Sequence, residues 1–119
     1  YMFYYACSGM SGVTSLPDGF MNTSGLTGSP ALYMFYYACS GMSGVTNSYV
    51  FNISSNVTLT ADNVNSPFNN AFYGMSKWTG TVMWGTNVLF EAITPAERTY
   101  TIFNCTQIPG YAGFDANWK

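Results

Sequence analysis

The sequence predicts an all-β fold of antiparallel strands, arranged as a sandwich or barrel. Short runs rich in β-branched and aromatic residues are separated by Gly, Asn, Pro and Ser, which is typical of strands joined by turns. No window of eleven residues carries an apolar stripe at helical spacing between good helix formers. The predicted strands are residues 33–39, 49–53, 56–61, 79–84, 87–93 and 98–105, and the best helical candidate is a single turn at residues 95–98.

One segment occurs twice. The letters YMFYYACSGMSGVT fill positions 1–14 and return at 33–46 without a substitution. This identity indicates a recent duplication, an engineered one or an accident of sequence assembly. Both copies encode the same strand, so the spare copy must lie on a sheet edge, pair with its twin or cross to another subunit. Residues 15–32 have the composition of a linker, which divides the chain into an assembly strand (1–14), a linker (15–32) and a β-sandwich body (33–119).

The composition argues against several classes of protein. The 119 residues are 48% hydrophobic and only 7% charged, whereas an average soluble domain has about 25% charged residues. The three Lys and Arg residues are too few for a nucleic-acid surface, and the absence of His removes the commonest general base and metal ligand. Every apolar run is shorter than the about 20 residues of a membrane-spanning helix. We therefore expect no enzyme activity, cofactor, metal, nucleic-acid partner or membrane span.

The cysteines favour a secreted protein. Cys7 and Cys39 are the same residue of the repeated segment, which leaves Cys39 and Cys105 as the pair for one disulfide. Such a bridge would add about 4 kcal/mol of stability and would imply an oxidising compartment. Two buried thiols in a reducing cell are the alternative. Cys7 is then either free or paired between chains.

N-linked glycosylation is predicted at four N-x-Ser/Thr sequons, and plain surface asparagine is the alternative. The sequons begin at Asn22, Asn52, Asn56 and Asn104. Asn56 and Asn104 fall on the outward side of their predicted strands. Sugar at these positions would supply the hydration that the few charged residues do not.

Residues 93–105 resemble the turn between strands E and F of fibronectin type III and related immunoglobulin-like domains. In those domains an aliphatic residue precedes x-Pro, a short polar turn follows, and a Tyr opens the next strand. Ile93, Pro95 and Tyr100 occupy these places, with one extra residue before Tyr100. The resemblance implies an immunoglobulin-like antiparallel β-sandwich, in which the Tyr hydroxyl bonds back to a turn carbonyl.

The chain is also similar in kind to secreted pilus and thread subunits that polymerise by strand donation. It has a hydrophobic N-terminal arm, a linker, a body of predicted strands and few charges. The resemblance implies a structural subunit of an extracellular filament, a cell-surface appendage whose partner is a further copy of itself. The assembly strand would begin with Tyr1, Met2, Phe3, Tyr4 and Tyr5.

Two other functions stay open. A capsid or surface-layer protein would also be all-β and assembly-forming, and it would differ by closing into a shell or lattice. A carbohydrate- or ligand-binding module would use exposed aromatic side chains, with Trp78, Trp84 and Trp118 as its platform, unless Trp84 belongs to the core.

Overall fold

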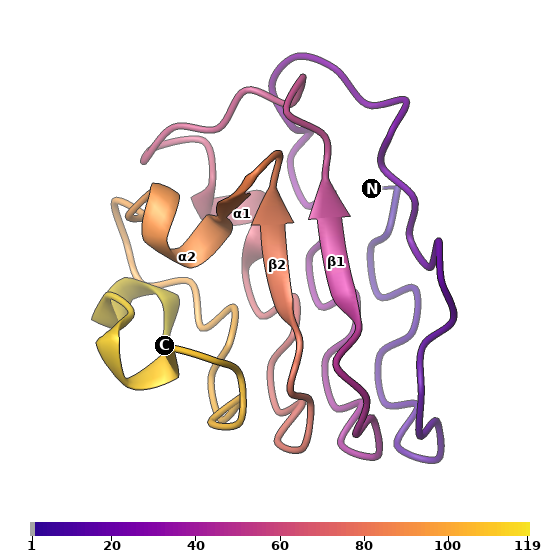
Figure 1. The fold of residues 1–119 in the computed structure, drawn as a ribbon. Helices are drawn as coiled ribbons and strands as arrows, with labels where there is room; N and C mark the ends of the chain where they lie inside the picture. Colours follow the sequence, from indigo (N-terminus) through magenta and orange to yellow (C-terminus); the bar gives the residue numbers. More distant parts are fainter. Residues whose placement is uncertain (1) are drawn as a thin grey trace.

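In the computed structural model of the chain, which describes residues 2–119, successive stretches of about 32 residues stack side by side as the rungs of a solenoid (Figure 1). The described residues form rung 1 (2–32), rung 2 (33–65), rung 3 (66–97) and rung 4 (98–119). Tyr1, the first residue of the predicted assembly strand, lies outside the described residues. The chain advances from one end of the stack to the other, so the first and last rungs lie at opposite ends. Each rung contacts only its neighbours in such a stack, so the two ends are its special surfaces.

A small sheet forms the front of the solenoid as drawn in Figure 1. Strand β1 (Val50–Ile53) of rung 2 pairs in parallel with β2 (Thr81–Trp84) of rung 3, and β3 (Asn87–Val88) pairs with β2 in antiparallel orientation. The sheet order is β1-β2-β3. Phe51, Ile53 and Val82 point inward and are buried. Strands are therefore confirmed within residues 49–53 and 79–84.

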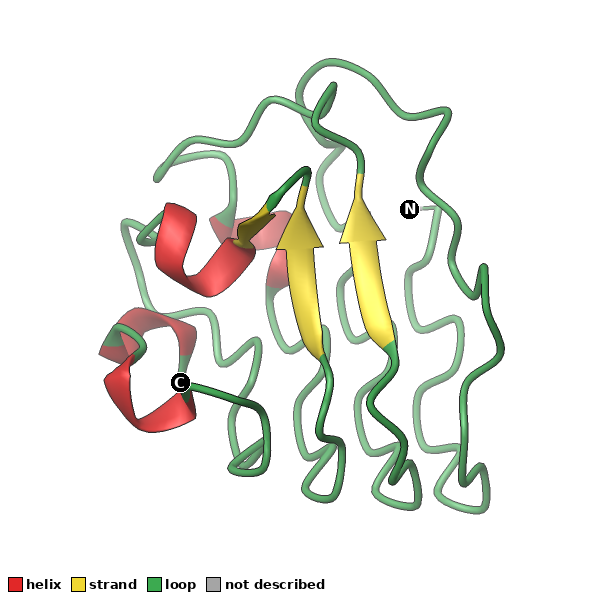
Figure 2. Cartoon of the chain, viewed as in Figure 1, coloured by secondary structure: helices red, strands yellow, loops and turns green. Residues whose placement is uncertain are grey.

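The helices are short and few in the part of the chain that the structure describes (Figure 2). They are α1 (Asn65–Phe68), α2 (Leu89–Ala92) and the 3-10 helices η1 (Tyr111–Gly113) and η2 (Ala116–Trp118). The mostly non-helical character that the sequence predicts is thus present. Two details differ, because residues 95–98 contain no helix and residues 89–92, predicted as part of a strand, form α2. Residues 56–61 form only an isolated bridge, at Val57.

The back of the solenoid consists of consecutive tight turns. In rung 2 the N–H groups of Tyr36, Ala38 and Ser40 each donate to the carbonyl three residues earlier. Tyr37 and Gly41 have φ angles of 52° and 76°, in the left-handed region that interrupts an extended strand. The strands predicted at 33–39 and 98–105 are therefore wrong, because these residues alternate between local turn bonds and bonds to the next rung.

A ladder of amide hydrogen bonds joins the back segments, defined as residues 2–9, 34–41, 67–74 and 98–104. The donors in rung 2 are Phe35, Tyr37, Cys39 and Gly41, and their acceptors in rung 3 are Pro67, Asn69, Ala71 and Tyr73. The equivalent places in rung 1 donate to rung 2, and in rung 3 Asn70, Phe72 and Gly74 donate to rung 4. The ladder N–H groups of the described back segments therefore point toward the C-terminal end, and the accepting carbonyls point toward the N-terminal end.

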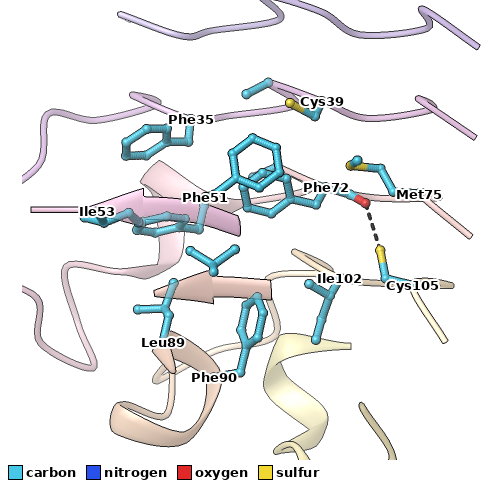
Figure 3. Close-up of a cluster of buried hydrophobic side chains, with 14 of the residues drawn as sticks. Phe35, Cys39, Phe51, Ile53, Phe72, Met75, Leu89, Phe90, Ile102 and Cys105 are labelled. Carbon is cyan, nitrogen blue, oxygen red and sulfur yellow. Dashed lines mark hydrogen bonds between the residues drawn. The ribbon is translucent and has the colours of Figure 1, made fainter. Parts of the chain in front are cut away.

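The core fills the space between the front sheet and the back segments (Figure 3). The ring of Phe51 in β1 lies 4.5 Å from that of Phe72 and 5.3 Å from that of Trp78. Residues 2–119 hold one three-stranded sheet, and its inner face packs on the turn-built back rather than on a second sheet. The expected antiparallel sandwich is thus corrected to a stack with parallel pairing, because β1 and β2 come from successive circuits of the chain that run in the same direction.

The expected tyrosine corner is also not formed. Tyr100 is exposed, has a φ angle of 52°, and lies with its ring 4.6 Å from the guanidinium carbon of Arg98. Within residues 2–119 its hydroxyl donates to no turn carbonyl. Tyr100 instead occupies the place in rung 4 that Tyr37 and Asn70 occupy in the preceding rungs, since all three have the same left-handed backbone.

Candidate assembly surface

The C-terminal end of the solenoid is covered by the last residues of the chain. The Trp118 side chain is fully buried, with its ring 5.1 Å from that of Phe90. The carbonyls of Asn117 and Trp118 accept hydrogen bonds from the N–H groups of Thr99 and Ile102, at 2.7 and 3.1 Å. Residues 116–118 therefore act as a cap that satisfies donors of rung 4 and excludes water from the core.

The N-terminal end is open. The carbonyls of Met2, Ala6 and Ser8 accept no hydrogen bond from any described residue. The equivalent carbonyls in rung 2 all accept bonds from rung 1, at 2.7–2.8 Å, and belong to Met34, Ala38 and Ser40. The first back segment is thus the edge of a ladder and presents acceptors without donors, which is a template for pairing with another chain.

The repeated segment shows directly what this end exposes. Met10 is 47% exposed and its counterpart Met42 is 1% exposed, while Met2 is 60% exposed and Met34 is 9% exposed. Because the two segments have the same sequence, these differences arise from position in the stack alone. The open end is therefore an apolar surface that would be core if another rung covered it.

Aromatic rings form columns that end at this surface. Phe3 stacks on Phe35 with ring centroids 5.4 Å apart, and Phe35 stacks in turn on Phe68 at 5.0 Å. Tyr5 stacks on Tyr37 at 4.9 Å. Each such pair contributes about 0.5–1.5 kcal/mol beyond its buried area. The described residues of the predicted assembly strand, Met2, Phe3, Tyr4 and Tyr5, thus lie together at the open end and pair with their twin in rung 2.

Two equivalent glycines report on the space above each rung. A Cβ atom built on Gly44 would lie 2.2 Å from the carbonyl oxygen of Ser11 in rung 1, so only glycine fits there. A Cβ atom on Gly12, its counterpart, meets nothing within 4 Å. At Gly44 this space is filled by the backbone of rung 1. At Gly12, which lies at the open end of the stack, the same space is empty.

Residues 15–32 form the front half of rung 1 instead of a free tether. Leu16 is buried, and the buried hydroxyl of Thr23 donates to the carbonyl of Asn52 at 2.6 Å. The N–H of Gly28 donates to the carbonyl of Asn56 in rung 2 at 2.9 Å. The whole of rung 1, not only the predicted arm, is packed on rung 2.

The predicted disulfide is not formed, and all three cysteines are free. Cys39 and Cys105 lie on either side of Phe72 and Met75 (Figure 3). They belong to rungs 2 and 4, so their separation is about two strand spacings, or roughly 9.5 Å, beyond the roughly 7 Å limit for bridged Cα atoms. The Cys105 thiol donates to the carbonyl of Phe72 at 2.9 Å, and burial raises its pKa to about 12. Burial also raises the pKa of Cys7, which is partly buried above Cys39.

The structure also shows which of the side chains predicted for glycosylation and ligand binding are exposed. All four sequon asparagines, Asn22, Asn52, Asn56 and Asn104, are exposed, as glycosylation would require. The proposed tryptophan platform is not formed. Trp78 and Trp118 are fully buried, and the indole of half-buried Trp84 donates to the carbonyl of Val57 at 2.8 Å.

Within residues 2–119, no helix has the length and apolar character needed to cross a bilayer. The same residues contain no cluster of three or more His, Cys, Asp or Glu side chains that could hold a metal ion.

No protein-family model matches this chain, and neither the curated proteins nor the solved structures contain a match.

Residues 1–14 were predicted as the assembly strand, but the sequence did not indicate that Ala6 and Ser8 present unbonded carbonyls there, or that Met10 and Gly12 lie at the open end of a stack. Residues 68–79, FNNAFYGMSKWT, share Phe, Ala, Gly, Met, Ser and Thr with residues 35–46, FYYACSGMSGVT, at the same places. A third occurrence at a similar interval indicates a stack of repeats. In such a stack, every repeated position has one copy in the end rung, where no further rung covers it.

Proposed function

We propose that the chain is a structural subunit of an extracellular filament, a pilus-like or thread-like appendage, and that the open end of rung 1 is its assembly surface. The observation that carries this proposal is the contrast between the two ends. The cap at residues 116–118 covers one end, whereas Met2 and Met10 at the other end are about half exposed beside unbonded carbonyls.

The chemistry of the open edge supports assembly. Edge strands of proteins that stay monomeric are usually interrupted by charged residues or Pro. The segment at positions 1–14 contains neither. An exposed apolar surface of this kind is typical of a site that a partner covers.

The remaining surface is compatible with an exported subunit. The four exposed sequon asparagines all lie outside residues 2–14, so sugar attached to them would leave the first back segment uncovered. The low charge of the chain also suits a subunit that is packed against neighbours.

Sedimentation velocity over a range of concentrations, together with electron microscopy, tests this function. The informative variant is Met10→Lys, which places a charge on the open end. The matched control is Val50→Lys, which changes an exposed apolar residue on the front sheet. Burial of one Met side chain is worth about 1.5–3 kcal/mol, so Met10→Lys should weaken self-association roughly ten- to hundredfold.

The expected result is uniform fibres for the wild type and for Val50→Lys, and dispersed monomers for Met10→Lys. A wild-type chain that stays monomeric at every concentration would contradict the proposal. Closed shells or flat lattices would contradict the filament while keeping an assembly role.

A further inference from the structure

We propose that the occupant of the open end is residues 1–14 of a second copy of this chain, stacked in parallel and in register as an additional rung. This inference rests on the proposed function for its biological setting and goes further by naming the partner segment and its orientation. Three independent observations carry it.

The first observation is that the open end repeats a surface already seen in complex. Rung 2 presents residues 33–46 to residues 2–14 of rung 1, and rung 1 presents the same sequence to solvent. A second copy of residues 1–14 can therefore form on rung 1 the contacts that rung 1 forms on rung 2. These include the ladder bonds from Phe3, Cys7 and Gly9, and the stacking of Phe3 on its counterpart.

The second observation is the direction of the ladder. The open end offers the carbonyls of Met2, Ala6 and Ser8, so its occupant must supply N–H donors at matching intervals. Two open ends placed face to face would oppose acceptors to acceptors. The C-terminal end cannot supply these donors, because N–H groups of rung 4 already donate to the carbonyls of Asn117 and Trp118 in the cap. Residues 1–14 present their ladder donors on the side that faces the next rung, which is the required geometry.

The third observation is the room above Gly12. In the stacked pair, the carbonyl oxygen of Ser11 occupies the place where a Cβ atom of Gly44 would be. The same place above Gly12 is open, so the Ser11 carbonyl of an incoming segment can enter it. A side chain at position 12 would close this place.

Exchange of this segment also explains how growth would continue. When residues 1–14 of one copy leave their own rung 2 and stack on a neighbour, they expose the carbonyls of Met34, Ala38 and Ser40 in their own chain. That newly exposed edge has the sequence of the open end and can accept the next copy. The exchanged subunit then has one donor segment and two acceptor edges, its own rung 2 and the carbonyl side of its donated segment, and a further copy that stacks on either edge extends an open fibre head to tail.

The test uses a synthetic peptide with the sequence of residues 1–14, labelled at its C-terminus, and fluorescence anisotropy with the full chain. The control peptide carries N-methyl groups on Cys7 and Gly9, which remove two ladder donors and change no side chain. The protein variant is Gly12→Ala, checked by circular dichroism and thermal unfolding for an intact fold.

The expected result is that the unmodified peptide binds and slows fibre growth, while the N-methylated peptide binds at least tenfold more weakly. Gly12→Ala should fold like the wild type and bind the peptide at least tenfold more weakly. If the chain forms fibres that Met10→Lys abolishes, but Gly12→Ala and both peptides leave fibre growth unchanged, the named occupant is wrong and the filament function stands. If the peptide binds in this manner to a chain that never forms fibres, the slot is real and the filament function is wrong.

Discussion

Two alanine substitutions in identical sequence contexts should have opposite effects on stability. Gly44→Ala brings a Cβ atom within 2.2 Å of the Ser11 carbonyl oxygen and 2.7 Å of the Val13 carbonyl oxygen, both backbone atoms of rung 1. Such an overlap forces rung 1 to shift, and overpacking of this kind costs about 1–3 kcal/mol. Gly12→Ala places the same methyl group in open space. It should leave the monomer unchanged or stabilise it by up to about 1 kcal/mol, because alanine restricts the unfolded chain.

Urea denaturation of both variants under monomeric conditions measures this difference. Native-state hydrogen exchange shows which part of the fold is destabilised. The amides of Phe3, Cys7 and Gly9 donate to rung 2, so they should be the first to lose protection in Gly44→Ala. Equal losses of stability in the two variants, or wild-type protection of these three amides in Gly44→Ala, would contradict the expected difference. Local sequence cannot explain a difference between them, since positions 1–14 and 33–46 are identical.

Two further predictions concern the cysteines. Burial raises the pKa of Cys105 from 9.0 to about 12, so the unfolded chain loses this proton first and stability should fall as pH rises from about 9 to 12, by on the order of 4 kcal/mol at most. Cys105→Ser keeps a donor for the Phe72 carbonyl but does not titrate in this range. Between pH 8 and pH 10.5, urea denaturation should therefore show a smaller loss of unfolding free energy for the variant than for the wild type. Equal losses would contradict this prediction. In native protein near neutral pH, iodoacetamide should modify Cys7 alone, with Cys39 and Cys105 reacting only after unfolding. A mass two hydrogens lower under non-reducing conditions would instead indicate that a disulfide forms.

The sequence predicted the parts of the fold in which the backbone is ordinary. Strands β1 and β2 consist mainly of β-branched and aromatic residues, and both fall within the predicted ranges. The low helix content follows from the same pattern. Parallel pairing was not predicted, because alternation of side chains gives the inward face of a strand but not the direction of its neighbour.

The back segments escaped prediction because their aromatic residues favour strands by composition while their backbone forms turns. Tyr5 and Tyr37 adopt left-handed φ angles of 51° and 52°, which tyrosine rarely adopts in isolation. The surrounding ladder bonds and stacked rings stabilise this conformation, so its cause lies in neighbouring rungs. Single-segment propensity contains no information about those neighbours.

The three places proposed for the spare copy from sequence were a sheet edge, its twin and another subunit. The structure combines the first two, because residues 2–14 pair with rung 2 on one side and form the open edge on the other. The third place follows from this combination. Residues 2–14 bind residues 33–46 on one side. Because positions 1–14 and 33–46 are identical in sequence, the other side of residues 2–14 has the same surface that residues 33–46 use to bind them, so a further subunit can bind there without a new kind of interface. A verbatim repeat at the end of a directional ladder is therefore a self-complementary end, and Gly12→Ala tests this at a position where an added Cβ atom meets nothing in the monomer.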